Sequence, residues 1–301
     1  YQNITMDALK IVMDGLMRRY RERVPDVMKT TKIMQDNGLI ESFDSIENDH
    51  VAFRTMGVEH LGIASFEKIF LAYGYTKKEY FYFEGKKLNA FWFAPPSPQF
   101  PRIFVSELRV HDLPADIQSI IYKYTNQITT DPVDKLDLTD GYAVDAFLHQ
   151  PLWETPTWED FQKLQEVSEY AAWVIYNRYY LNHYTISVHN LPNGYSDIYK
   201  FNTLLEANGI KLNTAGGVVK VSPDGGLLQS STVAEMIPAH FADGSTHLIA
   251  GSYVEFAERK VLPEFAHLPE TELKREHRRE GFETGNADKI FESTFTSQTL
   301  R

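Results

Sequence analysis

The sequence contains no cysteine. Disulfides, thiolate metal sites and cysteine nucleophiles are therefore excluded, and any bound metal has to be held by histidine and carboxylate side chains. Long apolar runs are missing too. The densest apolar segments are short and interrupted by Lys, Asp or Pro, and none approaches the roughly 20 residues that a membrane-spanning helix needs. We therefore expect a soluble protein without a membrane segment.

Positive charge is scarce: 30 Lys and Arg residues stand against 41 Asp and Glu residues, which gives a formal net charge of −11. The one basic run is short, at residues 274–279. Nucleic acid is therefore not an expected partner, because binding to phosphates needs a basic surface. Phosphate-binding loops, dinucleotide fingerprints and the Gly-x-Ser-x-Gly motif are also missing, and the glycine pairs at 216–217 and 225–226 are typical of hairpin turns.

A pattern of strand, helix and three strands occurs twice in the sequence, which predicts two βαβββ modules at residues 45–112 and 180–260. In the first module the predicted elements are a strand at 50–55, a helix at 65–73, and strands at 80–84, 87–94 and 102–110. In the second they are a strand from 182, a helix from 201, and strands at 217–222, 227–234 and 247–258. The helix motif repeats position by position, from Phe66 to Gly74 and from Phe201 to Gly209.

Three further segments complete a single predicted catalytic domain, residues 1–301. An N-terminal helical region covers 1–44 and contains an amphipathic helix at 6–20 that ends before Pro25. A helical connector covers 113–179, and a C-terminal segment covers 261–301. We predict an α+β fold in which the two modules pack by pseudo-twofold symmetry into one curved, partly closed sheet with added helices.

Two histidines stand at matching strand starts, His50 in the first module and His183 in the second. A single histidine at such a place is usually a structural group, but the repeat brings this pair across a shared groove. Glu255 lies on the last strand of the second module between large apolar neighbours, where a carboxylate needs a partner. Two histidines and one carboxylate form a facial triad, which leaves three coordination positions free and favours Fe(II) oxygen chemistry.

Other polar residues allow alternatives. Arg54 shares a strand face with His50, so we expect its planar guanidinium to bind a substrate carboxylate. Glu107 stands roughly where Glu255 stands in the other module, as a fourth ligand or, as we favour, a structural acid. His189 competes with His183, although the turn beside it favours a structural role. Five other histidines have no matched partner and are not assigned to the site: His60, His111, His149, His240 and His247.

The sequence resembles a known family, the 2-oxoadipate dioxygenase/decarboxylases, which includes bacterial lysine-catabolism enzymes and plant relatives. The motifs that carry the resemblance lie at 49–55, 182–185, 228–232, 253–259 and 281–288. The resemblance implies a vicinal-oxygen-chelate-like sheet and an iron site at His50, His183 and Glu255. It also implies that Arg54 binds the substrate carboxylate, with Gln229 as a second substrate-binding residue.

The expected function is that of an Fe(II)-dependent dioxygenase that converts 2-oxoadipate and O2 to 2-hydroxyglutarate and CO2 in lysine catabolism. Its partners would be O2 and a 2-oxo dicarboxylic acid, with no 2-oxoglutarate cosubstrate. The chain begins at Tyr1, and its likeness to the plant branch implies a plastid location after loss of a transit peptide, with the cytoplasm as the alternative.

Two rival functions remain open. The first is a lyase or isomerase of the glyoxalase type, with Zn(II) or another divalent ion as Lewis acid and Glu107 as fourth ligand. The second is a non-catalytic starch- or protein-binding module, which the four tryptophans suggest. These are Trp92, Trp153, Trp158 and Trp173.

Overall fold

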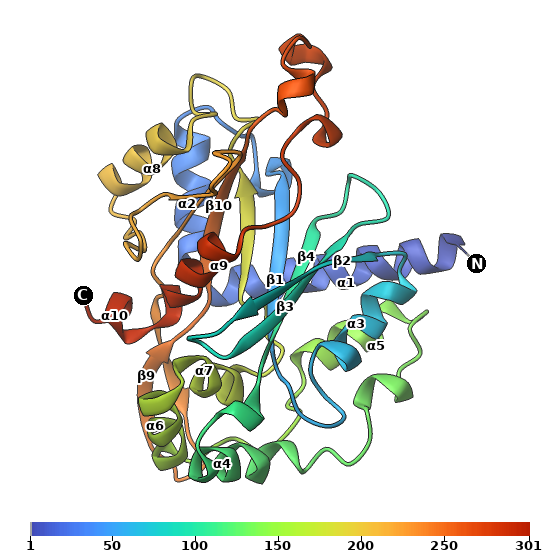
Figure 1. The fold of residues 1–301 in the computed structure, drawn as a ribbon, viewed down its shortest axis with the longest axis vertical. Coiled ribbons are helices and arrows are strands. Elements are labelled where there is room, and N and C mark those ends of the chain that lie inside the picture. Colours follow the sequence, from blue (N-terminus) through green and yellow to red (C-terminus); the bar gives the residue numbers. More distant parts are fainter. Residues whose placement is uncertain (1) are drawn as a thin grey trace.

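A curved eight-stranded sheet forms the centre of the molecule in the computed structural model, which describes residues 2–301 (Figure 1). Its strand order is β2-β3-β4-β1-β5-β10-β7-β6, and β8 and β9 form a separate two-stranded sheet. The strands are β1 Asn48–Met56, β2 Thr76–Phe83, β3 Leu88–Ala94, β4 Arg102–Leu108, β5 His183–Ser187, β6 Lys220–Val221, β7 Leu227–Ser231, β8 Met236–His240, β9 Thr246–Ala250 and β10 Tyr253–Arg259.

Helices surround this sheet, and α4, α6 and α7 gather at one end of the molecule (Figure 1). The α-helices are α1 Gln2–Arg23, α2 Pro25–Asp36, α3 Ile63–Ala72, α4 Ala115–Thr125, α5 Gly141–His149, α6 Trp158–Val167, α7 Glu169–Asn177, α8 Ile198–Ala207, α9 Thr284–Ile290 and α10 Thr296–Thr299. The 3-10 helices are η1 Phe43–Ser45, η2 Val110–Asp112, η3 Pro132–Lys135, η4 Pro263–Phe265, η5 Glu270–Glu272, η6 Arg275–His277 and η7 Phe291–Thr294. No helix within residues 2–301 is long and apolar enough to cross a membrane.

The sheet consists of two matching halves that meet where β1 pairs antiparallel with β5. On one side β4 runs parallel to β1, and on the other β10 runs parallel to β5. Next come β3 and β7, each antiparallel to its inner neighbour, and the edge strands are β2 and β6. The predicted order βαβββ is therefore confirmed in both modules, as β1-α3-β2-β3-β4 and β5-α8-β6-β7-β10.

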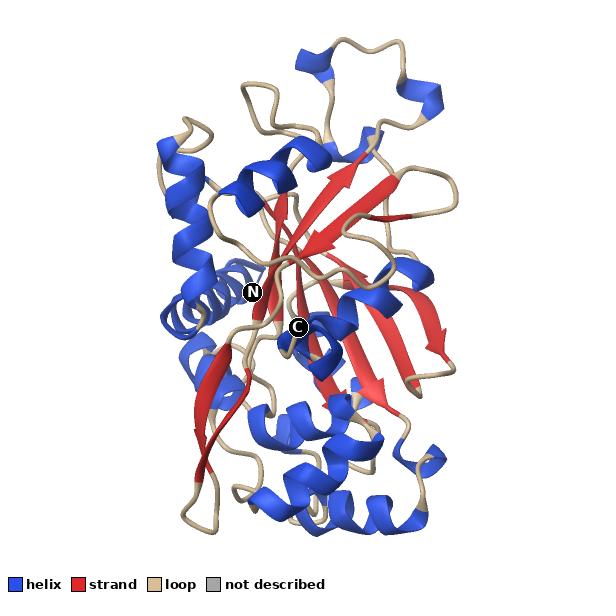
Figure 2. Cartoon of the chain, turned by 90° about the vertical axis from the view of Figure 1, so that its left-hand side faces the viewer, coloured by secondary structure: helices blue, strands red, loops and turns tan. Residues whose placement is uncertain are grey.

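The predicted strand at 247–258 is wrong in one respect, because the chain leaves one sheet and enters another in its middle. Residues 246–250 form β9, which pairs with β8 apart from the main sheet (Figure 2), and β10 begins only at Tyr253. The backbone of Gly251 donates to the Glu235 carbonyl and accepts from the Trp173 indole. A side chain at 251 would meet Ile237 at 3.2 Å. Contacts distant in sequence thus divide a segment that looks continuous.

A second difference from the prediction lies at the edge of the sheet. The strand expected at 217–222 is reduced to β6, Lys220–Val221. The buried Lys220 ammonium donates to the carbonyls of Asn213 and Gly217, at 2.8 and 2.6 Å. The loop before β6 therefore folds around this side chain instead of extending the ladder.

The core lies between the sheet and its helices. On α1, Leu9, Val12 and Leu16 are fully buried at the helical spacing that the sequence indicates. α1 packs so closely on α5 that a side chain at Gly141 would lie 2.7 Å from the Ala8 carbonyl. The tryptophans belong to this interior: three are at most 3% exposed, and Trp158 stacks on His247. They form no exposed aromatic surface of the kind that a starch-binding module uses.

Glu107 and Glu258 occupy equivalent places in the two halves and perform the same structural task. In the strand register Arg102 lies opposite His50, and Tyr253 lies opposite His183. Glu107 is the fifth residue after Arg102, and Glu258 is the fifth residue after Tyr253. Glu107 Oε1 accepts from the first amide of α3 at 2.9 Å, and Glu258 Oε1 accepts from the first amide of α8 at 2.8 Å. Each carboxylate thus satisfies an otherwise unpaired amide at the positive end of a helix dipole.

We predict that Glu107→Ala and Glu258→Ala each lower the free energy of unfolding by about 1.5–3 kcal/mol, the usual contribution of a hydrogen bond to a charged group. Urea denaturation of the purified variants measures this. Glu59→Ala serves as the control, because this glutamate precedes α3 with an 87% exposed side chain. Losses no larger than that of the control would contradict the capping role.

Candidate metal centre

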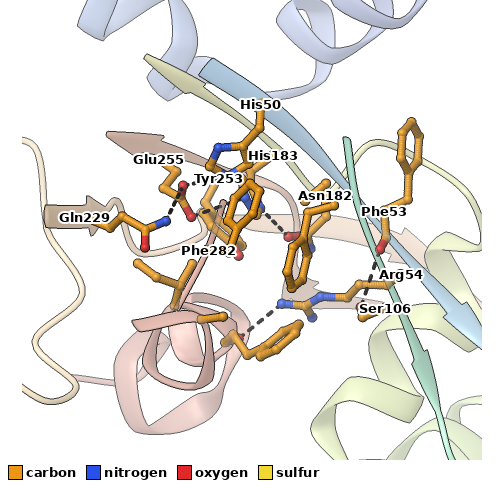
Figure 3. A pocket seen from close by; sticks show the side chains of 15 residues that line it. His50, Phe53, Arg54, Ser106, Asn182, His183, Gln229, Tyr253, Glu255 and Phe282 are labelled. Atoms are coloured by element: carbon orange, nitrogen blue, oxygen red, sulfur yellow. Dashed lines mark hydrogen bonds and ion pairs between the residues drawn. The ribbon is translucent and has the colours of Figure 1, made fainter. Parts of the chain in front are cut away.

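Three side chains from the middle of the sheet meet at one point. They are His50 on β1, His183 at the start of β5 and Glu255 on β10, each at most 5% exposed (Figure 3). One ligand atom from each lies within 4.8 Å of the others. Glu255 Oε2 is 2.7 Å from His50 Nε2, and Glu255 Oε1 is 3.3 Å from His183 Nε2. Adjacent strands of the two halves thus bring together residues separated by more than 200 positions.

The residue immediately before each histidine orients its ring. Asp49 Oδ1 accepts from His50 Nδ1 at 2.7 Å, and Asn182 Oδ1 accepts from His183 Nδ1 at 2.7 Å. The Nε2 of each ring therefore faces Glu255 and would be the atom that binds a metal. His50 Nε2 also lies 2.9 Å from Thr185 Oγ1.

The carboxylate of Glu255 is kept ionised. Burial by itself would raise its pKa, but the charges of His50 and His183 outweigh burial and hold the pKa well below its ordinary value. Thr185 Oγ1 and Gln229 Nε2 also donate to Oε2, at 3.0 and 3.2 Å. Burial would lower the pKa of His50, yet Glu255 and Asp49 raise it, whereas burial lowers the pKa of His183.

One atom indicates that this cluster is incomplete without a cation. His183 Nε2 is buried and makes no hydrogen bond, although Glu255 lies 3.3 Å away. A buried polar atom without a partner is costly, and a divalent ion among the three ligands would satisfy it. Across residues 2–301 no other group of three His, Asp or Glu side chains has comparable geometry. Nitrogen and oxygen donors without sulfur suit Fe(II) and other borderline divalent ions.

A small pocket joins this cluster to Arg54. Its sheet side includes Ala52, Phe104 and Ser106. Its opposite wall comes from the C-terminal segment. The residues of that wall are Phe282, Ala287, Ile290 and Phe291. The pocket is therefore mostly apolar, with polar groups concentrated at the histidines and at the arginine (Figure 3).

Arg54 is a buried cation without a counter-ion. It is 1% exposed and donates only to neutral oxygens, Thr294 Oγ1 at 2.8 Å and the Phe291 carbonyl at 3.1 Å. Its Nε has no hydrogen-bond partner, and no carboxylate of residues 2–301 forms an ion pair with it. Burying an unpaired charge is strongly unfavourable. The carboxylate of a ligand in the pocket would supply the missing partner, as the sequence-based prediction for Arg54 requires.

Gln229 also lines the pocket, but its amide is already engaged. Its Nε2 donates to Glu255, and its Oε1 accepts from Asn286 Nδ2 at 3.1 Å. This arrangement orients the Glu255 carboxylate. A direct contact between Gln229 and substrate stays a prediction.

The other candidates lie outside the cluster. His189 Nδ1 accepts from the Arg259 amide at 3.1 Å, and burial lowers its pKa to about 3. Glu107 is bound at the start of α3. Sequence reasoning assigned no role to Asp49 and Asn182, although their equal position before the two histidines could have revealed them. It also missed the C-terminal wall, for which the repeat gives no signal.

Comparison with known proteins agrees with this architecture. The model of the 2-oxoadipate dioxygenase/decarboxylase family matches residues 12–268. A relative from Arabidopsis thaliana, named chloroplastic 2-oxoadipate dioxygenase/decarboxylase, is 49% identical over 265 residues, which are 84% of this chain and 69% of the relative. A rice relative with the same activity name, chloroplastic/amyloplastic, is 45% identical over 97% of this chain and 80% of its own. Both names agree with the plastid location expected from the sequence.

Solved structures extend the comparison. Hydroxyglutarate synthase from Oryza sativa, crystallised in complex with 2-oxoadipate, superposes with a TM-score of 0.89 at 42% identity, covering 99% of this chain and 95% of that one. A glyoxalase superfamily protein from Ralstonia eutropha has a TM-score of 0.68 at 19% identity, covering 94% and 86%, and shares the fold alone. The predicted α+β, vicinal-oxygen-chelate-like fold is thereby confirmed, and the chain belongs to the 2-oxoadipate dioxygenase/decarboxylase family of enzymes.

Proposed function

We propose that this enzyme is an Fe(II)-dependent dioxygenase that converts 2-oxoadipate and O2 to 2-hydroxyglutarate and CO2. The observation that carries the proposal is the pocket in which a buried His-His-Glu cluster faces a buried arginine without a counter-ion. The names of both plant relatives and the 2-oxoadipate complex of the rice structure support this choice of substrate.

His50, His183 and Glu255 would hold the metal. An Fe(II) ion held there would supply the redox chemistry that protein side chains lack. Thr185 and Gln229 fix the Glu255 carboxylate by their two hydrogen bonds, so that it is oriented before the metal binds.

Arg54 would bind one carboxylate of the 2-oxo diacid. Its planar guanidinium makes two parallel charge-assisted hydrogen bonds to a carboxylate, which a lysine cannot reproduce. Phe104, Phe282 and Phe291 line the same pocket and exclude water from the reacting groups. The residues thus hold the substrate in a dry site at a fixed distance from the metal ligands, which supplies proximity and orientation.

The overall reaction makes a stoichiometric prediction. With iron-loaded enzyme and 2-oxoadipate under air, we expect one O2 consumed and one CO2 released per 2-hydroxyglutarate, without added 2-oxoglutarate. An oxygen electrode, CO2 trapping and mass spectrometry of the product measure the three quantities. Turnover without O2, or full activity with Zn(II) in place of iron, would refute the dioxygenase and support Lewis-acid chemistry of the glyoxalase type.

The metal assignment predicts the effect of removing each ligand. His50→Ala, His183→Ala and Glu255→Ala should each lower bound iron from about one ion per chain to nearly none, while circular dichroism shows an intact fold. Metal analysis after anaerobic loading and gel filtration measures the occupancy. His189→Ala is the control and should keep its iron, because His189 bonds only to the backbone of Arg259. Normal occupancy in a ligand variant would remove that residue from the site.

If Arg54 binds the substrate carboxylate, its replacement should lower kcat/KM without lowering the metal content. Arg54→Lys keeps the charge but not the bidentate geometry, so kcat/KM for 2-oxoadipate should fall by about 10- to 100-fold, equal to the loss of a charge-assisted hydrogen bond. Arg109→Lys is a matched control, since Arg109 is also buried but pairs with Asp112 away from the pocket. Unchanged kinetics in Arg54→Lys would show that Arg54 has only a structural role.

A further inference from the structure

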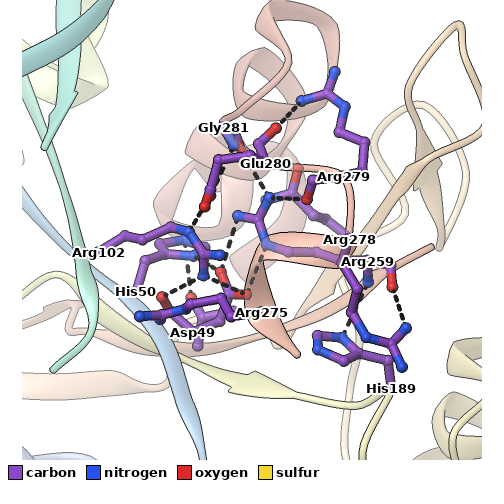
Figure 4. A network of polar contacts seen from close by, with 12 residues as sticks. Asp49, His50, Arg102, His189, Arg259, Arg275, Arg278, Arg279, Glu280 and Gly281 are labelled. Carbon is purple, nitrogen blue, oxygen red and sulfur yellow. Dashed lines mark hydrogen bonds and ion pairs between the residues drawn. The ribbon is translucent and has the colours of Figure 1, made fainter. Parts of the chain in front are cut away.

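Asp49, directly before His50, is the centre of a buried polar network on the side of His50 away from Glu255 (Figure 4). The side chain is 1% exposed and accepts from three residues. Besides His50 Nδ1 at 2.7 Å, Arg259 donates through Nε to Oδ2 at 2.8 Å and through Nη2 to Oδ1 at 3.1 Å. Arg102 Nη1 donates to Oδ2 at 3.2 Å. Both oxygens are therefore fixed.

The two arginines anchor Asp49 to the C-terminal segment. Arg259 Nη1 donates to the carbonyls of Arg279 and Gly281, at 3.0 and 2.8 Å. Arg102 Nε donates to Glu280. Phe282, the next residue of that segment, meets the His50 ring edge to face, with centroids 4.7 Å apart. The imidazole of His50 is thus held by a fixed carboxylate at Nδ1 and by an aromatic ring beside it.

His183 also has an aromatic ring beside it, because Tyr253 stacks on its imidazole with centroids 4.7 Å apart. It lacks a charged partner at Nδ1, although the two halves of the sheet match. Asn182 takes the place of Asp49 and accepts from His183 Nδ1 at the same distance of 2.7 Å. Its side chain is a neutral amide, and its Nδ2 is buried without a partner. The two histidines therefore differ in what stands behind them: a carboxylate held by two arginines for His50, and an unsupported amide for His183.

We propose that Asp49, fixed by Arg259, is a positioning residue that makes His50 the stronger and more rigid donor of the two histidines. A carboxylate that accepts the Nδ1 proton increases the basicity of Nε2 and fixes the tautomer, and loss of such a partner usually weakens metal binding by about 10- to 100-fold. This inference rests on the proposed metal site. Its competitor is a purely structural role, in which Asp49 only neutralises two buried arginines.

Metal affinity and stability together separate these roles. Titration of the apoprotein with Co(II) gives the dissociation constant and an absorption spectrum that reports the ligand field, and thermal unfolding gives Tm. We expect Asp49→Asn to lower Tm and to raise the dissociation constant by about 10- to 100-fold. Because this variant leaves Arg259 without an anion and can fail to fold, Arg259→Gln is combined with it to remove the unpaired charge.

The double variant should regain Tm but keep the weak affinity for Co(II) and the altered spectrum. Arg259→Gln alone retains Asp49 behind His50, so it should bind Co(II) more tightly than Asp49→Asn and more tightly than the double variant. The control is Asp145→Asn, another buried aspartate paired with an arginine, Arg19 at 3.1 Å. It should lose stability and keep its affinity.

Recovery of both Tm and affinity in the double variant, or an unchanged dissociation constant in Asp49→Asn, would overturn the positioning role and leave the metal site standing. Wild-type protein that binds no Co(II) would instead contradict the metal site, and with it the proposed function.

Discussion

The antiparallel pairing of β1 with β5 is the contact on which the rest of the site depends. It sets Ala52 opposite His183 and so places the two histidines on one face of the sheet at the junction of the halves. A shift of this register by one residue would turn one histidine to the other face, because strand side chains alternate. Glu255 then follows from the parallel pairing of β10 with β5, which sets it beside Thr185. Two choices of strand register thus assemble one cluster.

Most of the fold could be predicted from the sequence because both modules carry their pattern locally. The strand-like run of β1 and the glycine that follows α3 belong to short segments, and both patterns recur in the second module. What could not be predicted depends on distant contacts. Gly251 leaves the ladder because Glu235 and Trp173 bind its backbone. Likewise β6 is short because the Lys220 ammonium, rather than its backbone, satisfies nearby carbonyls.

The same distinction applies to the site. The repeat was sufficient to bring His50, His183 and Glu255 together, but it did not show that Glu107 corresponds to Glu258 and not to Glu255, since that comparison needs the strand register. The wall formed by residues 282–291 has no counterpart in either module, so no internal comparison could reveal it. Arg54 was expected on the face of His50, yet its lack of an ionic partner is visible only once every neighbouring side chain is placed.

The two halves of the sheet carry different residues at corresponding positions of the site. The place in β4 that corresponds to Glu255 is occupied by Phe104, paired with Ala52, and the place in β5 that corresponds to Arg54 is occupied by Ser187. The second half therefore contributes the Glu255 carboxylate, and the first half contributes the Arg54 guanidinium. The pocket has the His-His-Glu cluster at one end and Arg54 at the other. A ligand with two similar ends therefore meets different groups at each end, so the enzyme can distinguish these ends.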